Sequence, residues 1–512
     1  MLARAGTIAL EGITARRVEV EVDLSRGNVP CLNLVGLPDG TMREAKERLR
    51  AALGNSGFQI PAVRITINLA PADLPKEGSG YDLPMAVGLL AAMGVIPVES
   101  TESRIFLGEL SLDGRLYPVP GSLPTALFAR QEGITELIVP EANGAEAALV
   151  PGVRVIGVAT LAQLVMHLRG SHPLPSLPTT DWHAWLGRID PGMREIAEVK
   201  GQEFAKRALE VAAVGGHNLV MSGPPGSGKT LLARCIAGLL PPLTLDEALE
   251  VTAIWSVAGR LTQAAPLVGT RPFRAPHHTA SAISLVGGGN SPRPGEVSLS
   301  HNGVLFLDEL TEFGRTTLEV LREPLEAGMV TISRALRSAN FPAVFQLIAA
   351  FNPCPCGHLG DPFHDCTCSS SQIARYRARL SGPLMDRIDI HIQVPPVPFD
   401  KLMHLPGGDN SATVRQRVIA ARNRQYQRNG PGRLNASLQG LELERHVALD
   451  DAGANLLRQA AKRLGFSARG FHRILRVARS IADLDQAERV DVGHLGEAIQ
   501  FRLESTINPS GT

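Results

Sequence analysis

Several features that would each indicate a class of protein are scarce in this sequence. Only six of the 512 residues are cysteine, which excludes a scaffold held together by disulfides. The longest uncharged apolar run, residues 83–98, is too short to span a bilayer, and no basic stretch followed by a long apolar one begins the chain. We therefore expect a cytoplasmic protein without a membrane span.

An excess of charge of one sign is also missing. The chain has 51 Lys and Arg residues against 50 Asp and Glu residues, so its net charge is +1. Any nucleic-acid partner must then be met by local basic clusters and not by the field of the whole molecule. Aromatic residues make up only 4%, but apolar residues make up 44%, which is enough to build cores and excludes global disorder.

The length predicts two to four folding units, because a domain usually holds about 100 to 200 residues. Short β-branched runs alternate with helical patterns over residues 1–168, which predicts an α/β domain. Residues 169–182 are rich in proline and small polar residues and should form a semi-rigid linker. A second α/β domain is predicted over 183–398 and a small helical domain over 410–507, with no internal repeat.

A P-loop follows the strand predicted at 217–221 and precedes a predicted helix. It consists of Gly223, Pro224, Pro225, Gly226, Ser227, Gly228, Lys229 and Thr230. Glycines let backbone N–H groups and the helix N-terminus face phosphates, Lys229 suits the β- and γ-phosphates, and the Thr230 hydroxyl suits Mg²⁺. The sequence therefore predicts a site for ATP and Mg²⁺.

Two further predicted strands end in polar residues suited to hydrolysis. The strand at 303–307 leads into Asp308, expected to hold Mg²⁺ through water, and Glu309, expected to polarise the attacking water. The strand at 344–350 leads to Asn352, whose side chain can orient that water against the γ-phosphate. Asn before Pro is also a common turn, so a plain turn is the alternative for Asn352.

These motifs, with four further segments, resemble the magnesium-chelatase-like AAA+ ATPases of the ComM/YifB group. The segments are RAPHHT from Arg274, GGG from Gly287 with PGE from Pro294, SGPLMDRID from Ser381, and SARGFHRILR from Ser467. The resemblance runs nearly end to end. It implies an AAA+ core with a C-terminal helical lid, assembled as a ring, a hexamer, with ATP sites between subunits.

The resemblance also implies roles for two arginines. Arg387 would be the finger offered to the γ-phosphate of the neighbouring subunit, and Arg469 would be the lid sensor, both placing positive charge near the transferring phosphoryl group. Arg379, Arg473 and Arg476 are close rivals, and the alternative for each is a surface or salt-bridged arginine.

The segment between Lys229 and Asp308 is longer than a minimal strand-helix-strand passage needs. In related ATPases such inserts form loops that face the central pore of the ring. His277 and His278 lie in this insert, and a structural or pore-loop role is expected for them, because adjacent histidines rarely converge on one ion without further ligands.

Four cysteines fall within fifteen positions of one another: Cys354, Cys356, Cys366 and Cys368. Two pairs of thiolates across a short gap suit a closed tetrahedral Zn²⁺ site with a structural role. The C-x-C spacing is less specific than C-x₂-C, His358 or His364 could replace one thiolate, and four reduced cysteines in a loop are the alternative.

Segments of the first domain resemble the proteolytic domain of Lon, which has a ribosomal-S5-like α/β fold. They are DLPKEGSGYDLP from Asp73 and GELSLDGRLYPVPG from Gly108. The resemblance places the Lon nucleophile at Gly80 and the region of its activating lysine at residues 124–126, so neither half of a Ser/Lys dyad is present. We expect a scaffold or a DNA-facing module without peptidase activity.

Three functions compete: a DNA motor, the ATPase subunit of a metal-insertion chelatase, and an ATP-dependent protease. The resemblance to ComM favours a DNA translocase or branch-migration helicase in recombination or natural transformation, acting on branched or single-stranded DNA. Local support comes from a cluster of arginines that could contact phosphates if they share a face. They are Arg415, Arg417, Arg422, Arg424, Arg428 and Arg433. A solvated basic helix balanced by acidic neighbours is the alternative.

Overall fold

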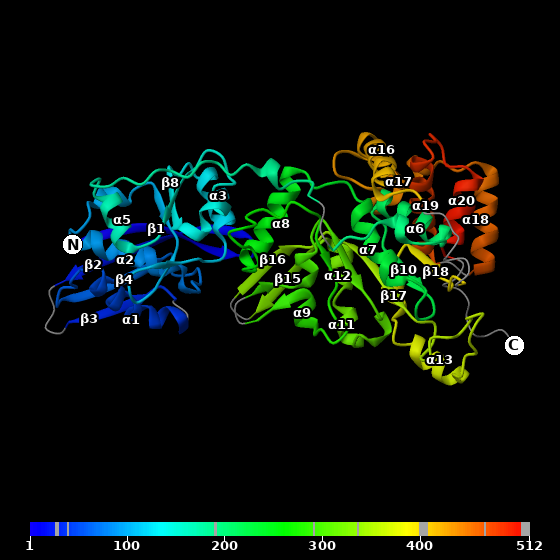
Figure 1. The fold of residues 1–512 in the computed structure, drawn as a ribbon, viewed down its shortest axis with the longest axis horizontal. Helices are drawn as coiled ribbons and strands as arrows, with labels where there is room; N and C mark the ends of the chain where they lie inside the picture. The colour runs from blue at the N-terminus through cyan, green and yellow to red at the C-terminus, as the bar shows by residue number, and fades with distance from the viewer. Residues whose placement is uncertain are drawn as a thin grey trace.

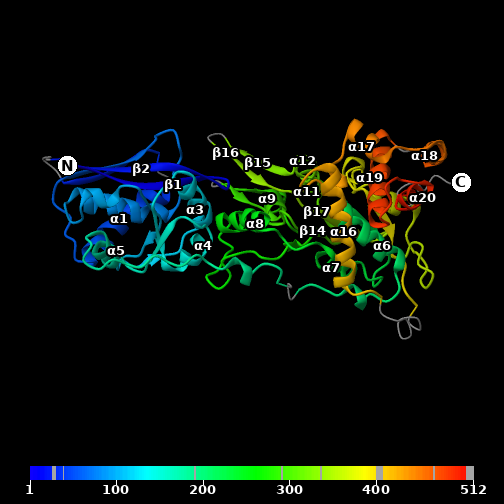
Figure 2. The same ribbon diagram turned by 90° about the horizontal axis from the view of Figure 1, so that it is seen from above.

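The computed structural model of the chain describes residues 1–25, 30–37, 40–188, 192–289, 292–334, 337–398, 408–464 and 467–502. The molecule is elongated, with an N-terminal α/β part at one end and the C-terminal helices at the other (Figures 1 and 2). Residues 503–507 of the predicted helical domain lie outside the described residues. Among the helices described, none combines the length and the apolar character that crossing a bilayer requires.

The N-terminal part is built on one mixed seven-stranded sheet, in the order β3-β4-β2-β1-β5-β8-β9. Its strands are β1 (Leu2–Glu11), β2 (Thr14–Ser25), β3 (Cys31–Val35), β4 (Arg64–Ala70), β5 (Arg104–Phe106), β8 (Glu136–Pro140) and β9 (Arg154–Val158). Alternate residues of β2, among them Val18, Val20 and Val22, are buried, as expected for a strand with one core face. The helices are α1 (Gly40–Asn55), α2 (Asp82–Ala92), α3 (Ser122–Gln131), α4 (Gly144–Ala147) and α5 (Leu161–Leu168).

The proline-rich segment after α5 lies against this first sheet. The backbone N–H of Leu177 donates to the carbonyl of Val155 at 2.8 Å, and that of Thr180 donates to the carbonyl of Ala148 at 2.9 Å. The backbone N–H of Leu174 donates to Nδ1 of His167. The segment expected to be a connector is thus an extended strap, bonded to the part of the chain that it follows.

The second sheet has five parallel strands in the order β11-β14-β17-β10-β18. They are β10 (Leu219–Ser222), β11 (Phe273–Arg274), β14 (Val304–Leu307), β17 (Gln346–Phe351) and β18 (Ile390–Gln393). The main helices of this part are α6 (Glu203–Gly215), α7 (Lys229–Leu239) and α8 (Leu245–Val257), with shorter α9 (Ala282–Val286), α10 (Glu296–Leu299), α11 (Arg315–Glu319), α12 (Arg322–Ala327), α13 (Ser370–Arg377) and α14 (Gly382–Met385). A hairpin of β15 (Met329–Arg334) and β16 (Arg337–Pro342) projects beside this sheet (Figure 2). The chain is thus α/β as predicted, and the sheet behind the P-loop is parallel.

The C-terminal helices are α16 (Ser411–Asn429), α17 (Gly440–Val447), α18 (Asp451–Leu464), α19 (Ala468–Leu484) and α20 (Val492–Gln500). The part of the predicted helical domain that the structure describes is helical, as expected. Val414 of α16 and Ile474 of α19 share one buried core with Leu209 of α6 and Leu232 of α7. The C-terminal helices are therefore packed onto the strand-and-helix core.

The two α/β parts share a hydrophobic core. Leu123 and Ala126 of α3 are buried in the same cluster as Ala248 and Ala253 of α8. At this joint the Ser256 hydroxyl donates to the Glu146 carboxylate and accepts from the backbone N–H of Gly121. Burial raises the pKa of Glu146. A joint of this kind resists free rotation of the first part against the second.

Candidate nucleotide site and the residues around it

The polar residues predicted for hydrolysis lie at one edge of the parallel sheet. β10 pairs with β17, and β17 with β14, so the carboxyl ends of the three strands are neighbours. The P-loop follows β10, Asp308 follows β14, and Asn352 follows β17. In open α/β sheets ligands bind at this edge.

The glycines of the P-loop are required by its backbone. Gly226 and Gly228 have φ of 76° and 91°, which L-residues with a side chain rarely adopt. A Cβ at Gly223 would lie 2.3 Å from the carbonyl oxygen of Val394, a contact that no side chain can make. Gly228 precedes α7, so the loop ends at the N-terminus of an eleven-residue helix, where anions bind favourably.

Lys229 lies under the loop and is almost fully buried. Its Nζ donates to the carbonyls of Gly223 at 2.7 Å and Pro224 at 2.8 Å, and to Oδ1 of Asn352 at 3.2 Å. Burial lowers the pKa of Lys229, and the charge of Asp308 acts in the opposite direction. The lysine and asparagine predicted for one site are thus in contact.

Thr230 and Asp308 are also paired. The Thr230 hydroxyl donates to Oδ2 of Asp308 at 2.7 Å, and Oδ1 of the same carboxylate accepts from the backbone N–H of Glu309 at 3.0 Å. A hydroxyl and a carboxylate within hydrogen-bond distance offer the oxygen ligands that Mg²⁺ prefers. The donor set fits the predicted cation.

Glu309 is adjacent to this network, but its carboxylate contacts a residue outside the network. Its backbone is left-handed, with φ of 51°, and its side chain is 55% exposed. Oε2 lies 2.9 Å from Nδ1 of His278, a residue of the insert between β11 and β14. The sequence did not predict this contact, because no spacing rule links the two positions.

Arg387 and Arg469 lie in one polar cavity of about 700 Å³. The cavity is bounded by Asn218, which directly precedes β10, and Asn218 donates to the carbonyl of Arg387. β10 spans four residues, about 13 Å, with the P-loop at its other end. Both arginines therefore lie at the amino edge of the sheet, away from the P-loop of their own subunit.

This cavity is rich in positive charge. Four arginines (Arg387, Arg469, Arg473 and Arg476) line it with two carboxylates, Glu326 and Asp389. Arg387 Nη2 lies 2.5 Å from Glu326 and Arg473 Nε lies 3.4 Å from Asp389. Among the described residues, the buried Nε of Arg387 and Nη1 of Arg473 have no hydrogen-bond partner. Burial, with the charge of Arg502, lowers the pKa of Arg473 to about 10, against the opposite effect of Asp389. Such a cavity favours an anion.

The four clustered cysteines converge. Sγ of Cys354 lies 3.4 Å from Sγ of Cys356, and Sγ of Cys366 lies 3.7 Å from each of them. Cys368 belongs to the same group, within which all sulfur atoms lie within 4.8 Å of one another. Tetrahedral Zn²⁺ with bonds of about 2.3 Å requires sulfur atoms about 3.8 Å apart, which the cluster nearly provides.

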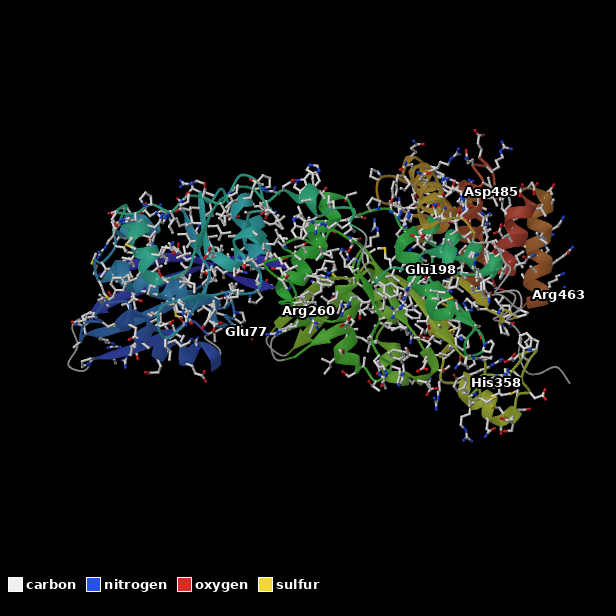
Figure 3. All side chains as sticks on the ribbon, in the orientation of Figure 1. Glu77, Glu198, Arg260, His358, Arg463 and Asp485 are labelled. Carbon is white, nitrogen blue, oxygen red and sulfur yellow. The ribbon has the colours of Figure 1, made fainter. Side chains whose placement is uncertain are left out.

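Neither of the nearby histidines replaces a thiolate. Nδ1 of His358 and Nδ1 of His364 each lie 3.0 Å from Oδ2 of Asp361, apart from the sulfur cluster. His358 lies in the loop beside α13 (Figure 3). The four cysteines are thus the complete donor set of the sulfur cluster among the described residues.

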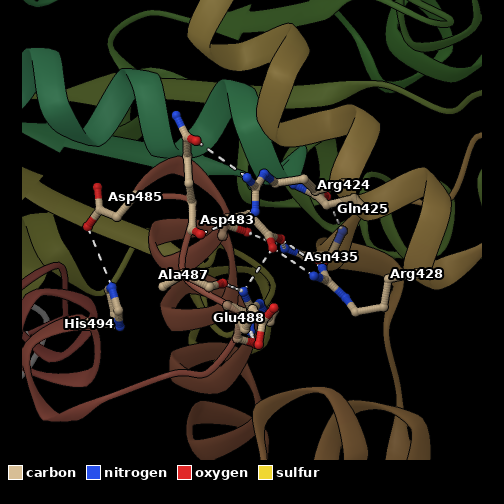
Figure 4. A network of polar contacts seen from close by, with 12 residues as sticks. Arg424, Gln425, Arg428, Asn435, Asp483, Asp485, Ala487, Glu488 and His494 are labelled. Atoms are coloured by element: carbon tan, nitrogen blue, oxygen red, sulfur yellow. Dashed lines mark hydrogen bonds and ion pairs between the residues drawn. The ribbon is translucent and has the colours of Figure 1, made fainter.

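The arginines of α16 and the loop after it are engaged within the chain. Arg415 donates to the carbonyl of Gly238, Arg422 to that of Ala213, and Arg424 to that of Gln486. Arg417 pairs with Glu210 and Asp409, Arg428 with Asp483, and Arg433 with Glu442. Figure 4 shows Arg424 and Arg428 turned toward neighbouring helix ends and loops. These contacts favour the alternative of a basic helix balanced within the chain, because the guanidinium groups join α16 and the loop after it to neighbouring elements.

The described residues of the region that resembles Lon hold no Ser/Lys pair at the positions expected from the sequence. The Ser79 hydroxyl donates to Glu109, whereas the buried ammonium of Lys76 donates to the carbonyl of Pro71. A Cβ at Gly80 would already lie 3.3 Å from Leu107, and the Thr125 hydroxyl donates to the carbonyl of Gly121. The described geometry gives no activated serine at these positions.

Similarity to known proteins extends over almost the whole chain. The family described as "Magnesium chelatase, subunit ChlI" matches residues 195–402, that described as "Subunit ChlI of Mg-chelatase" matches 20–143, and its C-terminal part matches 408–502. The YifB protein of Salmonella typhimurium is 45% identical, over 98% of this chain and 97% of the relative. The competence protein ComM of Haemophilus influenzae is 45% identical, over 96% of this chain and 95% of the relative. Lon protease 2 of Bacillus subtilis is 28% identical over 26% of this chain and 24% of its own length.

Proposed function

The chain belongs to the magnesium-chelatase-like AAA+ ATPases of the ComM/YifB group, and on this premise we propose that it is a ring motor, a hexamer, that hydrolyses ATP. The observation that carries the proposal is the contact of Lys229 with Asn352 and of Thr230 with Asp308 at one sheet edge. Four groups from three strands meet where a P-loop presents its backbone N–H groups.

Each group has a distinct task in this proposal. Lys229 would bind the β- and γ-phosphates, while Thr230 and Asp308 would hold Mg²⁺, which neutralises charge on the phosphate oxygens. Glu309 would accept a proton from the attacking water, and Asn352 would orient that water. Gly223 to Gly228 would supply the cradle of N–H groups.

The arginine cavity suits a site shared between subunits. Because Arg387 and Arg469 lie at the opposite edge of the sheet from their own P-loop, they cannot both serve the nucleotide bound there. In a ring the cavity of one subunit would face the P-loop of the next, and Arg387 would act as the finger with Arg469 beside it. Their positive charge would stabilise the oxygens of the transferring phosphoryl group.

ATP hydrolysis tests the site directly. Lys229→Ala should lose nucleotide binding, and Glu309→Gln should bind ATP without cleaving it, because a glutamine side chain cannot take up the proton of the water. Nucleotide binding and phosphate release are measured on both variants. Full turnover by the Glu309→Gln protein would remove Glu309 from its proposed role.

DNA is the substrate that we propose for this motor, acting as a translocase or branch-migration helicase in recombination or natural transformation. The support is the extent of similarity to a relative named as a competence protein. The arginines of α16 add nothing to it, since each has a partner within the chain. Contacts to branched or single-stranded DNA would then come from other surfaces of the ring.

A chelatase-type motor is the second candidate, favoured by the matches to magnesium chelatase subunit ChlI. The DNA motor and the chelatase-type motor are distinguished by measuring the ATPase rate with and without forked or four-way DNA. A DNA motor should be stimulated, and its binding should weaken with salt by roughly 0.7 to 0.9 in log K per log salt for each phosphate contact. No binding at low salt and no stimulation would favour the chelatase-type motor.

Structural Zn²⁺ is the ion that we propose is bound by Cys354, Cys356, Cys366 and Cys368. The sulfur separations and the all-thiolate donor set support it. Metal analysis after purification without chelator should give about one equivalent per chain. Finding no metal, with thiols that stay equally reactive when chelator is added, would leave the segment a plain loop.

A further inference from the structure

A second group of side chains that can bind metal lies in the loop between the two cysteine pairs. His358, Asp361 and His364 follow one another at intervals of three residues, and their ligand atoms lie within 4.8 Å of one another. Nδ1 of each histidine lies 3.0 Å from the same atom, Oδ2 of Asp361. This His-Asp-His group is separate from the sulfur cluster, which already has its four thiolates.

Two consecutive turns bring the three side chains together. The backbone N–H of Asp361 donates to the carbonyl of His358 at 3.1 Å, and Gly360 in this turn has a φ of 78°, which glycine adopts readily. Oδ1 of Asp361 then accepts from the backbone N–H of Phe363 at 2.9 Å, and the chain turns again before His364. One carboxylate oxygen is thus fixed by the backbone, while the other faces both imidazole rings.

The His-Asp-His group is arranged as an ion requires. Oδ2 of Asp361 makes hydrogen bonds with both Nδ1 atoms and so holds the two rings, whose centroids are 4.8 Å apart. A metal ion would replace the Nδ1 protons between the same three ligand atoms. Because metal–nitrogen and metal–oxygen bonds are about 2.0 to 2.2 Å long, adjacent ligand atoms lie about 3 Å apart around one ion. The separations in the loop match this value.

We propose that His358, Asp361 and His364 bind one divalent transition-metal ion, with water in the remaining coordination positions. Two imidazole nitrogens and one carboxylate oxygen suit Zn²⁺, Co²⁺ and Ni²⁺, whereas Mg²⁺ and Ca²⁺ prefer sites made of oxygen alone. The side chain of Asp361 is 4% exposed and that of His364 is 65% exposed, so water reaches the ion from the side of His364. The site is open, in contrast to the closed sulfur cluster.

The ion would be bound by a segment that contacts the P-loop. Gly357 separates Cys356 from His358, and a Cβ at Gly357 would lie 2.6 Å from Cδ of Pro225. The ion would therefore restrain, together with the sulfur cluster, a loop that packs against the P-loop. The proposal does not rest on ATP hydrolysis, because none of the three ligands belongs to the nucleotide site.

Metal counting by equilibrium dialysis of the untagged full chain tests this site, with Co²⁺ as the probe. At saturation, the protein with both His358→Ala and His364→Ala should hold one equivalent of total metal less than the parent. This difference is expected whether or not the cysteines hold zinc. His172→Ala removes an exposed histidine of the strap after α5 and is the matched control, which should hold as much metal as the parent.

Single substitutions and the absorption spectrum of Co²⁺ complete the experiment. His364→Ala should weaken binding of the additional Co²⁺ by more than about tenfold. Asp361→Asn should do the same, although it keeps an oxygen for the N–H of Phe363. The equivalent lost in the double variant should show no thiolate charge-transfer band, because its ligands are nitrogen and oxygen. Equal metal content of the parent and the double variant, or a thiolate band that disappears with the histidines, would overturn the proposal.

Discussion

Two sets of arginines in the C-terminal half of the chain differ in what surrounds them. The six arginines of residues 415–433 donate to carbonyl, carboxylate or amide oxygens of their own subunit. The four around the cavity at the amino edge of the sheet outnumber its carboxylates, and two of them have buried N–H groups without partners among the described residues. Every arginine of the first set has an oxygen partner within its own subunit, whereas the second set keeps buried N–H groups without one among the described residues.

The difference shows that the density of arginine in a sequence does not measure its capacity to bind phosphate. A guanidinium group carries five N–H donors, and any oxygen within reach can satisfy them. Helix α16 lies beside α6, α7 and α19, whose carbonyls and carboxylates provide such oxygens. The cavity arginines lack enough of them, so an external anion is the better partner.

The largest effect is expected at Arg387. Arg387→Ala should bind ATP normally yet lose about a hundredfold or more of its hydrolysis rate, because a finger arginine stabilises charge that develops only in the transition state. Mixing it with Lys229→Ala should restore some activity, since an intact P-loop can then meet an intact finger at one interface. The rate is measured across a range of mixing ratios.

Arg379 provides the matched control for this experiment. It was a rival for the finger, but it pairs with Glu312 and with the carbonyl of Thr311. Arg379→Ala should therefore change the rate much less than Arg387→Ala. A reversed order of the two effects would transfer the finger to Arg379, and absence of complementation would argue against a shared site.

Much of this architecture was predictable because it depends on local pattern. The strand before Gly223 and the strand ending at Asp308 are short apolar runs with polar residues directly after them, and the topology of a parallel sheet brings such ends together. The order of strands adds Asn352 between them. The joint at Glu146 and Ser256 could not be predicted, because it depends on the packing of segments 110 residues apart.

Which side chains contact each other was the feature that the sequence predicted least well. Nothing in the sequence distinguishes the surroundings of Arg428 from those of Arg387. In the structure Arg428 contacts the buried Asp483, whereas Arg387 lines the cavity at the amino edge of the sheet. Likewise, His278 reaches Glu309 only because β11 and β14 are adjacent in the sheet. Such contacts depend on tertiary neighbours, which the spacing of residues in one chain does not specify.

A smaller effect is expected from breaking the α16 network. Arg428 makes two 2.7 Å bonds to the buried carboxylate of Asp483, which also accepts from Arg479 and Asn435. Arg428→Ala should lower the free energy of unfolding of the C-terminal helices by about 2 kcal/mol, because the remaining partners only partly compensate a buried charge. Thermal or urea unfolding followed by circular dichroism measures the loss.

Arg433 is the matched control for Arg428. It makes a two-bond contact of similar geometry with Glu442, but both side chains are partly exposed. Water screens such a pair, so Arg433→Ala should cost less than about 1 kcal/mol. Equal losses from the two substitutions would contradict the view that burial of Asp483 makes the Arg428 contact important.

The smallest effect is expected at Arg424, and it bears most directly on DNA. Arg424 is partly exposed and donates to the carbonyl of Gln486 at 3.2 Å and to the side-chain oxygen of Gln486 at 3.4 Å, so Arg424→Ala should change stability by less than about 0.5 kcal/mol. If α16 contacted DNA phosphates, removing this charge would also reduce the slope of log K against log salt by roughly 0.7 to 0.9. We expect the slope to stay unchanged, because the guanidinium group is already used within the chain. The slope is measured by fluorescence anisotropy with four-way DNA at several salt concentrations, and a reduction near one full contact would return α16 to the DNA-binding surface.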